Sequence, residues 1–172
     1  MEDKMLLDGT PQYNAVWDKV YDELHFKPGM KESVPFVLEM PHCVYDISRM
    51  IGERLEVLCD ELEDISKEIF AKVTPEGSRV YALDWQHSCF LYNPRNPDEQ
   101  KDFWQENARY MGGGYNVYFP TFFPDGDYYF FIAEDFSYGY LGHPWRQEVW
   151  IFGEPLIAEY EAIYKKFDWR KK

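Results

Sequence analysis

The chain has 172 residues, of which 45% are hydrophobic and 19% aromatic, which excludes a disordered protein and allows one domain with a substantial core. Its net charge of −13 disfavours nucleic acid and anionic membranes as partners. The same charge suits a basic protein partner, although solubility alone also explains it.

The cysteines and the N-terminus bear on the cellular environment. Three cysteines give no even disulfide framework. The first ten residues, MEDKMLLDGT, are acidic and contain no apolar run, so we expect no signal peptide. No stretch approaches the roughly 20 apolar residues of a membrane span. We therefore expect a cytoplasmic protein that does not associate with membranes, and the sequence leaves the oligomeric state open.

The first part of the chain predicts two helices. Thr10-Pro11 has the pattern of an N-cap followed by proline at the first helical position, and apolar residues then recur at helical spacing through residues 11–24. Two prolines make residues 30–41 a loop or a short edge strand. Residues 51–73 predict a second helix with an apolar face and a strongly acidic opposite face. Such an acidic face is either solvated or bound by a basic partner.

From residue 79 the pattern changes from helical to extended. Residues 80–92 predict one strand, rich in aromatic and apolar residues. Alternation would place on one of its faces Tyr81, Leu83, Trp85, His87, Cys89 and Leu91. We expect a polar loop next, then a short helix within residues 98–110, and a flexible glycine break at residues 112–114.

Several short strands are predicted in the second half of the chain. Strands at residues 115–123 and 128–133 flank Pro124-Asp125-Gly126-Asp127, which has the composition of a hairpin turn. Two further strands are expected at residues 138–141 and 147–152.

A last helix is expected to follow Gly153 and to end in a basic segment, which complements a helix C-terminus. Helices that are segregated from strands in the sequence indicate an α+β fold. We expect a single domain over residues 1–172, with an antiparallel sheet of about four to six strands packed by N-terminal helices and a C-terminal helix.

Most catalytic signatures are absent from the sequence. It contains no phosphate-binding glycine loop, no nucleophile elbow and no His-Glu-x-x-His helix. Asp125-Gly126-Asp127 contains an Asp-x-Asp pattern that can hold a divalent cation, but a tight turn explains it better.

A soft metal site is a further interpretation of the histidines and cysteines. His87 and Cys89 would share one strand face, and His42-Cys43 or His143 could complete a ligand set. Their spacing fits no zinc-finger motif, and such residues on an apolar face more often pack in the core. We therefore expect no metal and no cofactor.

The segment Gly142-His143-Pro144-Trp145 holds the most notable ionisable group. The proline restrains the backbone at this point, so the imidazole should be fixed at a corner between strands. It is either a structural histidine that locks the corner or a general acid/base. The second interpretation gives a cleft whose catalytic residues would be His143, Asp127 and His87. Its ligand-binding residues would be Trp85, Tyr129 and Trp145.

Three segments carry a resemblance to a known family: YALDWQHSCFLYNP (residues 81–94), FPDGDYYFFIAEDFSYGYLGHPW (123–145) and WIFGEPLI (150–157). In this order they resemble the bacterial proteins grouped as domain of unknown function 2716. The likeness extends to the helix VWDKVYDEL and the segment YDIS. It implies a soluble, single-domain bacterial protein, and it brings no activity, cofactor or catalytic residue.

Two classes of function remain open from the sequence. The first is a non-enzymatic acidic interaction protein, for example an immunity-type or inhibitor protein that neutralises a basic partner such as a nuclease toxin. The second is a small enzyme or ligand-binding protein that uses the cleft around His143.

Overall fold

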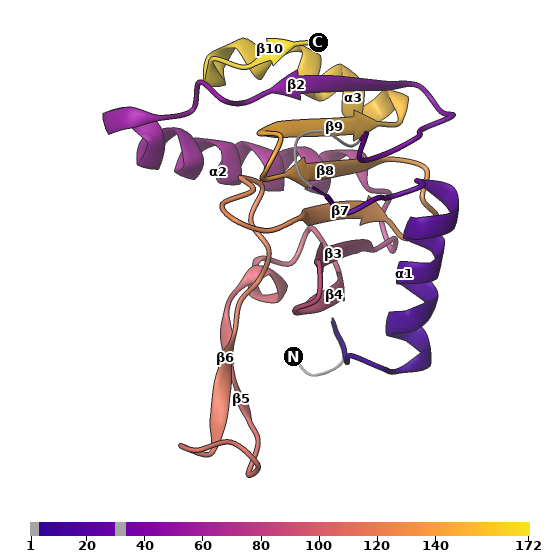
Figure 1. The fold of residues 1–172 in the computed structure, drawn as a ribbon, viewed down its shortest axis with the longest axis vertical. Coiled ribbons are helices and arrows are strands. Elements are labelled where there is room, and N and C mark those ends of the chain that lie inside the picture. Colours follow the sequence, from indigo (N-terminus) through magenta and orange to yellow (C-terminus); the bar gives the residue numbers. More distant parts are fainter. Residues whose placement is uncertain (1–3, 30–33) are drawn as a thin grey trace.

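Ten strands and three α-helices make up the computed structural model, which describes residues 4–29 and 34–172 (Figure 1). The α-helices are α1 (Pro11–Glu23), α2 (Leu55–Val73) and α3 (Glu154–Glu161). The strands are β1 (Met5–Leu6), β2 (His42–Asp46), β3 (Val80–Asp84), β4 (Cys89–Tyr92), β5 (Phe103–Glu106), β6 (Gly114–Val117), β7 (Tyr129–Ala133), β8 (Gly139–His143), β9 (Glu148–Phe152) and β10 (Arg170–Lys171). Short 3-10 helices are η2 (Gly52–Arg54), η3 (Pro97–Gln100) and η4 (Tyr164–Phe167).

Eight of these strands form one antiparallel sheet in the order β1-β4-β3-β7-β8-β9-β2-β10. The other two, β5 and β6, pair only with each other and extend away from the body as an arm (Figure 1). The α+β class is therefore confirmed, but the sheet is larger than the predicted four to six strands.

The sheet separates two apolar cores. On one face α1 packs with the segment that follows it, and this core centres on Trp17, Phe26, Phe36 and Phe130. On the other face α2 and α3 pack on a core that includes Phe70, Tyr140 and Tyr160. Successive side chains of a strand alternate between the two faces of the large sheet, so its buried apolar residues belong to one core or the other.

The two N-terminal helices are confirmed. The Thr10 hydroxyl accepts the Tyr13 N–H at 3.4 Å, and Pro11 occupies the first turn of α1. Helix α2 buries the apolar stripe that includes Leu58, Leu62 and Ile69. Of the predicted loop at residues 30–41, residues 30–33 lie outside the described part, and the rest contains no helix or strand. None of the helices in the described ranges is long and apolar enough to cross a membrane.

The prediction of a single strand over residues 80–92 is wrong, because a tight turn divides this segment into β3 and β4. In this turn the Asp84 N–H donates to the Ser88 carbonyl at 3.2 Å, and the His87 N–H donates to the Asp84 carbonyl at 3.0 Å. Gln86 adopts a left-handed conformation with φ of 64°. His87 therefore projects from a turn, whereas Cys89 is buried at the start of β4.

The region between β4 and β7 also differs from the prediction. The helix expected within residues 98–110 is reduced to one short turn, η3, and residues 103–106 form strand β5. Gly112 and Gly113 have positive φ angles of 91° and 81° and form the tip of the arm, which explains why glycines are required there. The segment at Asp125-Gly126 is a bend and does not join paired strands, because β6 pairs with β5.

The last helix begins after Gly153 as predicted, but α3 ends at Glu161. The chain then makes the turn η4 and adds β10 to the edge of the sheet beside β2. Part of the basic segment thus forms a strand, and its charges face acids on neighbouring elements, as in the Lys171–Glu161 and Arg170–Asp46 pairs.

Candidate functional site

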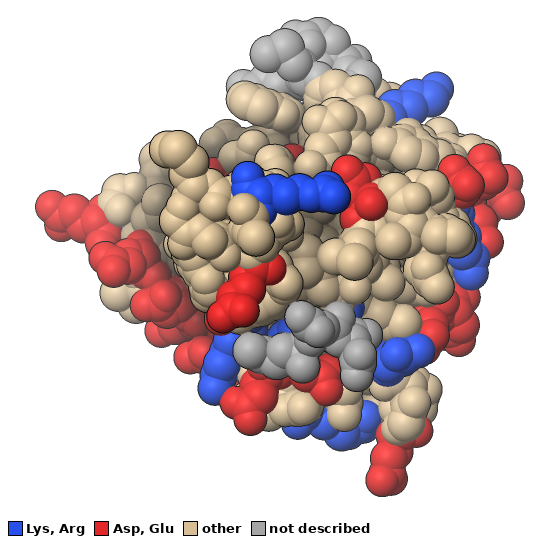
Figure 2. Space-filling view, turned by 90° about the horizontal axis from the view of Figure 1, so that it is seen from below, with Lys and Arg blue, Asp and Glu red and all other residues tan. Residues whose placement is uncertain are grey.

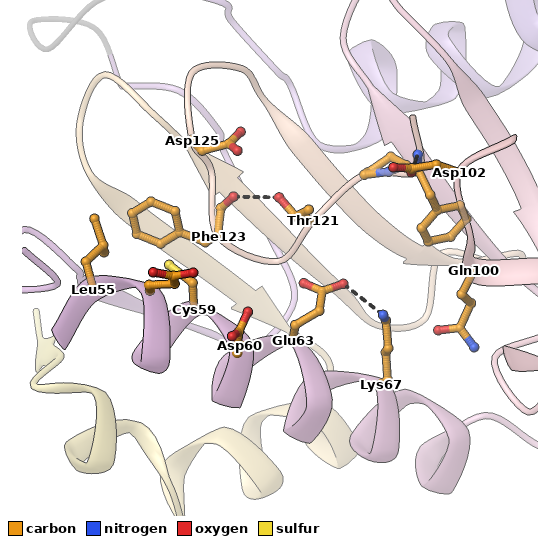
Figure 3. A pocket seen from close by; sticks show the side chains of 13 residues that line it. Leu55, Cys59, Asp60, Glu63, Lys67, Gln100, Asp102, Thr121, Phe123 and Asp125 are labelled. Atoms are coloured by element: carbon orange, nitrogen blue, oxygen red, sulfur yellow. Dashed lines mark hydrogen bonds and ion pairs between the residues drawn. The ribbon is translucent and has the colours of Figure 1, made fainter. Parts of the chain in front are cut away.

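An acidic groove runs between α2 and the segment at residues 119–125, with a volume of about 510 Å³ (Figure 3). Its carboxylates come from Glu56, Asp60, Glu63, Asp102 and Asp125. Its apolar lining comes from Leu55, Cys59, Phe119, Pro120 and Phe123. Among the described residues, Lys67 is the one basic side chain that lines it. In Figure 3 the side chains of α2 project toward the opposing loop, so the helix forms one wall and the loop the other.

Glu63 ties the two walls of the groove together. One of its carboxylate oxygens accepts the backbone N–H of Phe122 at 3.0 Å, and the other lies 3.4 Å from the Lys67 ammonium. Burial raises the pKa of the Glu63 carboxyl above its usual value, and the hydrogen bond and the ion pair oppose this. Asp60 and Asp125 are exposed and have no ion-pair partner among the described residues.

The molecular surface carries acidic side chains on more than one side. Figure 2 shows them gathered at the left, where α2 lies in Figure 1, and again at the right, where α1 lies. The middle of this view is mostly covered by uncharged residues, with a few acidic and basic side chains among them. The α2 side differs from the α1 side because there the carboxylates surround a groove with an apolar lining.

A second group of ionisable side chains lies at one end of the large sheet. Asp84 ends β3, His87 projects from the turn after it, and Asp127 precedes β7. The His87 Nδ1 atom lies 3.0 Å from Asp84 Oδ1 and 2.8 Å from Asp127 Oδ2. The other Asp127 oxygen accepts the Tyr128 N–H at 2.8 Å, which fixes that carboxylate.

The electrostatics of this cluster follow from two carboxylates that face one imidazole. Burial raises the pKa of Asp84 to about 7, and the neighbouring Asp127 carboxylate adds to the rise. The hydrogen bond to Asp84 raises the pKa of His87, whose side chain is 64% exposed. The cluster can therefore exchange a proton close to neutral pH, which is the property that a general acid or base needs.

A pocket of about 550 Å³ opens beside this cluster. It is bordered by the sheet end, by residues 5–8, and by the arm, whose contribution is largely aromatic: Tyr110, Tyr115 and Tyr118. Tyr129, from the same sheet face as Asp84, completes the wall. The structure thus brings together three of the residues predicted for a cleft, namely His87, Asp127 and Tyr129.

His143 lies at the same end of the sheet but on the α1 face, and its side chain is 0% exposed. Its Nδ1 atom accepts the Arg146 N–H at 3.1 Å, and its ring packs edge-on against Tyr128 at 4.8 Å. Its Nε2 atom is buried without a hydrogen-bond partner among the described residues. Burial lowers the pKa of His143 to about 4, and the Glu148 carboxylate only partly opposes this. These contacts hold a neutral imidazole that locks the corner between β8 and β9.

The two tryptophans predicted to bind a ligand also lie apart from the pocket. Trp85 packs on the α1 face, where its indole N–H donates to the Tyr21 hydroxyl at 3.0 Å. Trp145 is half-exposed in the turn between β8 and β9 and does not line the pocket beside His87. The predicted cleft is therefore divided by the sheet, with His143 and Trp85 on one face and His87, Asp127 and Tyr129 on the other.

Comparisons with known proteins agree with the resemblance found in the sequence. The profile of the family described as protein of unknown function (DUF2716) matches residues 9–157. The chain belongs to the DUF2716 family. It is similar to uncharacterized protein YxiI of Bacillus subtilis (strain 168), with 31% identity over 155 residues, which cover 87% of this chain and 86% of that protein. No solved structure matches it.

Two features of this DUF2716 protein were not found from its sequence. The acidic face of α2 was recognised, but Asp102 and Asp125 join it only through the fold. Asp84 belongs to no predicted site, because a continuous strand would place it and His87 on opposite faces of the sheet. A usable signal was the run Asp84-Trp85-Gln86-His87-Ser88, whose polar residues interrupt the apolar pattern of the strand.

Proposed function

We propose that this DUF2716 protein is a non-enzymatic acidic interaction protein that binds a basic protein partner through the α2 groove, in the manner of an immunity-type or inhibitor protein. The observation that supports this is the composition of the groove, which sets five carboxylates against one ammonium around an apolar lining. A cavity of this kind suits a lysine or arginine side chain, whose aliphatic stem packs on apolar atoms while its charge meets carboxylates.

The binding energy would come from several weak contacts. A solvent-exposed ion pair contributes about 0.2–1 kcal/mol, so no single carboxylate decides affinity. Together the acids of the groove would attract a basic surface at long range and accelerate association, an effect that salt screens. The apolar walls at Leu55 and Phe123 would supply contacts that persist at high salt.

The test compares two variants with the same change of net charge. In the groove variant Glu56→Gln, Asp60→Asn and Asp125→Asn are combined, and Glu63 is left intact because it joins the two walls. In the control variant Asp18→Asn, Asp22→Asn and Glu39→Gln are combined, all at exposed positions outside the groove. Each protein is immobilised, bacterial lysate is passed over it, and the captured protein is identified and then titrated in purified form.

We expect the wild type and the control variant to capture the same basic protein, and the groove variant to bind it at least about tenfold more weakly. Raising the salt concentration should slow association for the wild type and much less for the groove variant. Equal affinity of the groove and control variants, or binding that salt does not affect, would contradict the proposal.

A second function is favoured by the pocket beside His87. In a small enzyme or ligand-binding protein, His87 would act as the acid or base with Asp84 and Asp127 as its partners. A small-molecule screen by thermal shift tests this alternative, because a ligand of this pocket should stabilise the wild type and not the Tyr129→Ala variant. A ligand that stabilises both proteins equally would place its site elsewhere.

A further inference from the structure

We propose that Asp84, His87 and Asp127 form a binding site for a first-row divalent transition-metal cation such as Zn²⁺. This inference is independent of the proposed protein partner, because the cluster and the α2 groove have no lining residue in common. The sequence predicts no metal, because the spacing of its histidines and cysteines fits no zinc-finger motif and such residues on an apolar strand face usually pack in the core. The turn after β3 instead places His87 beside two carboxylates.

The donor atoms have the right chemistry for such a cation. One imidazole nitrogen and two carboxylate oxygens, one from each aspartate, lie within 4.8 Å of one another. Imidazole favours zinc and its neighbours over magnesium and calcium, while two carboxylates balance the charge of a divalent ion. The imidazole distinguishes this cluster from a surface group of acids, which would attract any cation without selecting one.

The geometry requires only a small adjustment. A cation with bonds of about 2.1 Å in tetrahedral arrangement separates its ligand atoms by about 3.4 Å. The His87 nitrogen now lies 3.0 Å and 2.8 Å from the two aspartate oxygens, so these two separations must each lengthen by about half an ångström. The His87 side chain is exposed and is free to move, whereas the carboxylates are held more firmly.

The backbone holds the aspartates in place before any cation binds. Asp84 is paired with Tyr129 in the sheet, and its N–H and carbonyl close the turn that carries His87. Asp127 is fixed through the Tyr128 N–H. Ligands preset by the main chain lose little conformational freedom on binding, and this favours affinity.

The remaining coordination positions would face the pocket beside the cluster. Three protein ligands leave at least one position of a tetrahedral ion for water or for a small molecule. The pocket of about 550 Å³ provides the space, and Tyr115, Asn116 and Tyr129 are among the polar residues that line it. The site is therefore of the open kind, in contrast to a closed structural zinc site.

Isothermal titration calorimetry of the full chain with ZnCl₂ at pH 7.5 tests the proposal. We expect one equivalent of Zn²⁺ to bind, and binding to weaken at least about tenfold in Asp127→Asn and in His87→Gln. The matched controls, Asp22→Asn and His25→Gln, change exposed residues of the same types away from the cluster and should bind as the wild type does.

Thermal unfolding supplies a second measurement that does not depend on heats of binding. Zn²⁺ should raise the melting temperature of the wild type and of both controls, and leave that of Asp127→Asn unchanged. Circular dichroism of each variant establishes that it is folded. Three results would overturn the proposal. The first is no binding at about 1 mM Zn²⁺, a concentration at which even a weak protein zinc site would be occupied. The others are unchanged binding in the two cluster variants and tighter binding of Mg²⁺ than of Zn²⁺.

Discussion

Two histidines lie at the same end of the large sheet and differ in almost every physical property. His143 is buried on the α1 face with its pKa lowered, whereas His87 is exposed on the opposite side with its pKa raised. The difference follows from the neighbours: a tyrosine ring and a backbone N–H surround the first, and two carboxylates the second. Backbone rigidity at a proline therefore does not make a histidine accessible, whereas a position among charged groups beside a pocket marks it as a candidate for function.

The largest expected difference between the two histidines is in how much each contributes to the free energy of unfolding. His143→Ala should lower the free energy of unfolding by about 3 kcal/mol, because it leaves a cavity and removes the acceptor of the Arg146 N–H. His87→Ala should cost less than about 1 kcal/mol, since the side chain is exposed. Urea unfolding followed by tryptophan fluorescence at pH 7 measures both changes. Similar losses in the two variants would remove the distinction between a structural and an accessible histidine.

The pH dependence should reveal the buried imidazole. The pKa of His143 falls from its ordinary value of 6.5 to about 4 on folding, so the unfolded chain binds the proton more readily and stability decreases as the pH falls below 6.5. Between pH 7 and pH 5 this residue alone should cost about 2 kcal/mol.

Other groups titrate in the same range, so the comparison must be made with a variant. Glu63 and Asp84 have raised pKa values and act in the opposite direction, because folding makes their protonation easier. The groups around His143 are Tyr128, Arg146 and Glu148, which both proteins retain. The wild type should therefore lose more stability than His143→Gln over this pH interval, and parallel curves would show that His143 does not titrate as inferred.

Removing the hydroxyls of two adjacent tyrosines, Tyr128 and Tyr129, should have a smaller effect on the free energy of unfolding. These two side chains lie on opposite faces of the large sheet. The Tyr128 hydroxyl donates to the Gly29 carbonyl at 2.7 Å and accepts the Gly29 N–H at 2.9 Å. Tyr128→Phe should lower the free energy of unfolding by about 1 kcal/mol, because both backbone groups lose this partner. Tyr129→Phe, at the exposed pocket, should change it by less than about 0.5 kcal/mol. Chemical denaturation ranks the two, and the reverse order would contradict the division of the faces.

The smallest change in the free energy of unfolding is expected for the Asp84→Asn variant. The amide keeps the shape of the side chain and removes one of two carboxylates that repel each other, so the free energy of unfolding at pH 7 should stay within about 0.5 kcal/mol of the wild type. Denaturant unfolding without added metal measures this. A loss above about 1 kcal/mol would mean that Asp84 is needed for the fold rather than available to a ligand.

The sequence predicts those parts of this fold that depend on local patterns. Both N-terminal helices and strands β7, β8 and β9 follow from periodicity, caps and turn residues. The hairpin of β3 and β4 was missed because its turn contains no glycine or proline and relies on a left-handed Gln86. Strands β1 and β10 have two residues each, too few for any periodic signal.

The candidate sites could be predicted only in part. The acidic face of α2 is visible in the sequence, but the groove needs the loop at residues 119–125 to fold over it. His87 and Asp127 are 40 positions apart, and only strand register brings them together. Contacts of this kind arise from topology, which one sequence does not encode in its local pattern.

The two outermost strands of the sheet have a consequence for aggregation. An exposed, aromatic-rich strand offers unpaired N–H and C=O groups that can recruit a strand from another molecule. Here β1 covers part of β4 at one edge, and β10 covers part of β2 at the other. Both covering strands are very short, and β10 consists of exposed Arg170 and Lys171. The short strands β1 and β10 therefore limit the pairing of the edges of this sheet with strands of another molecule of the same protein.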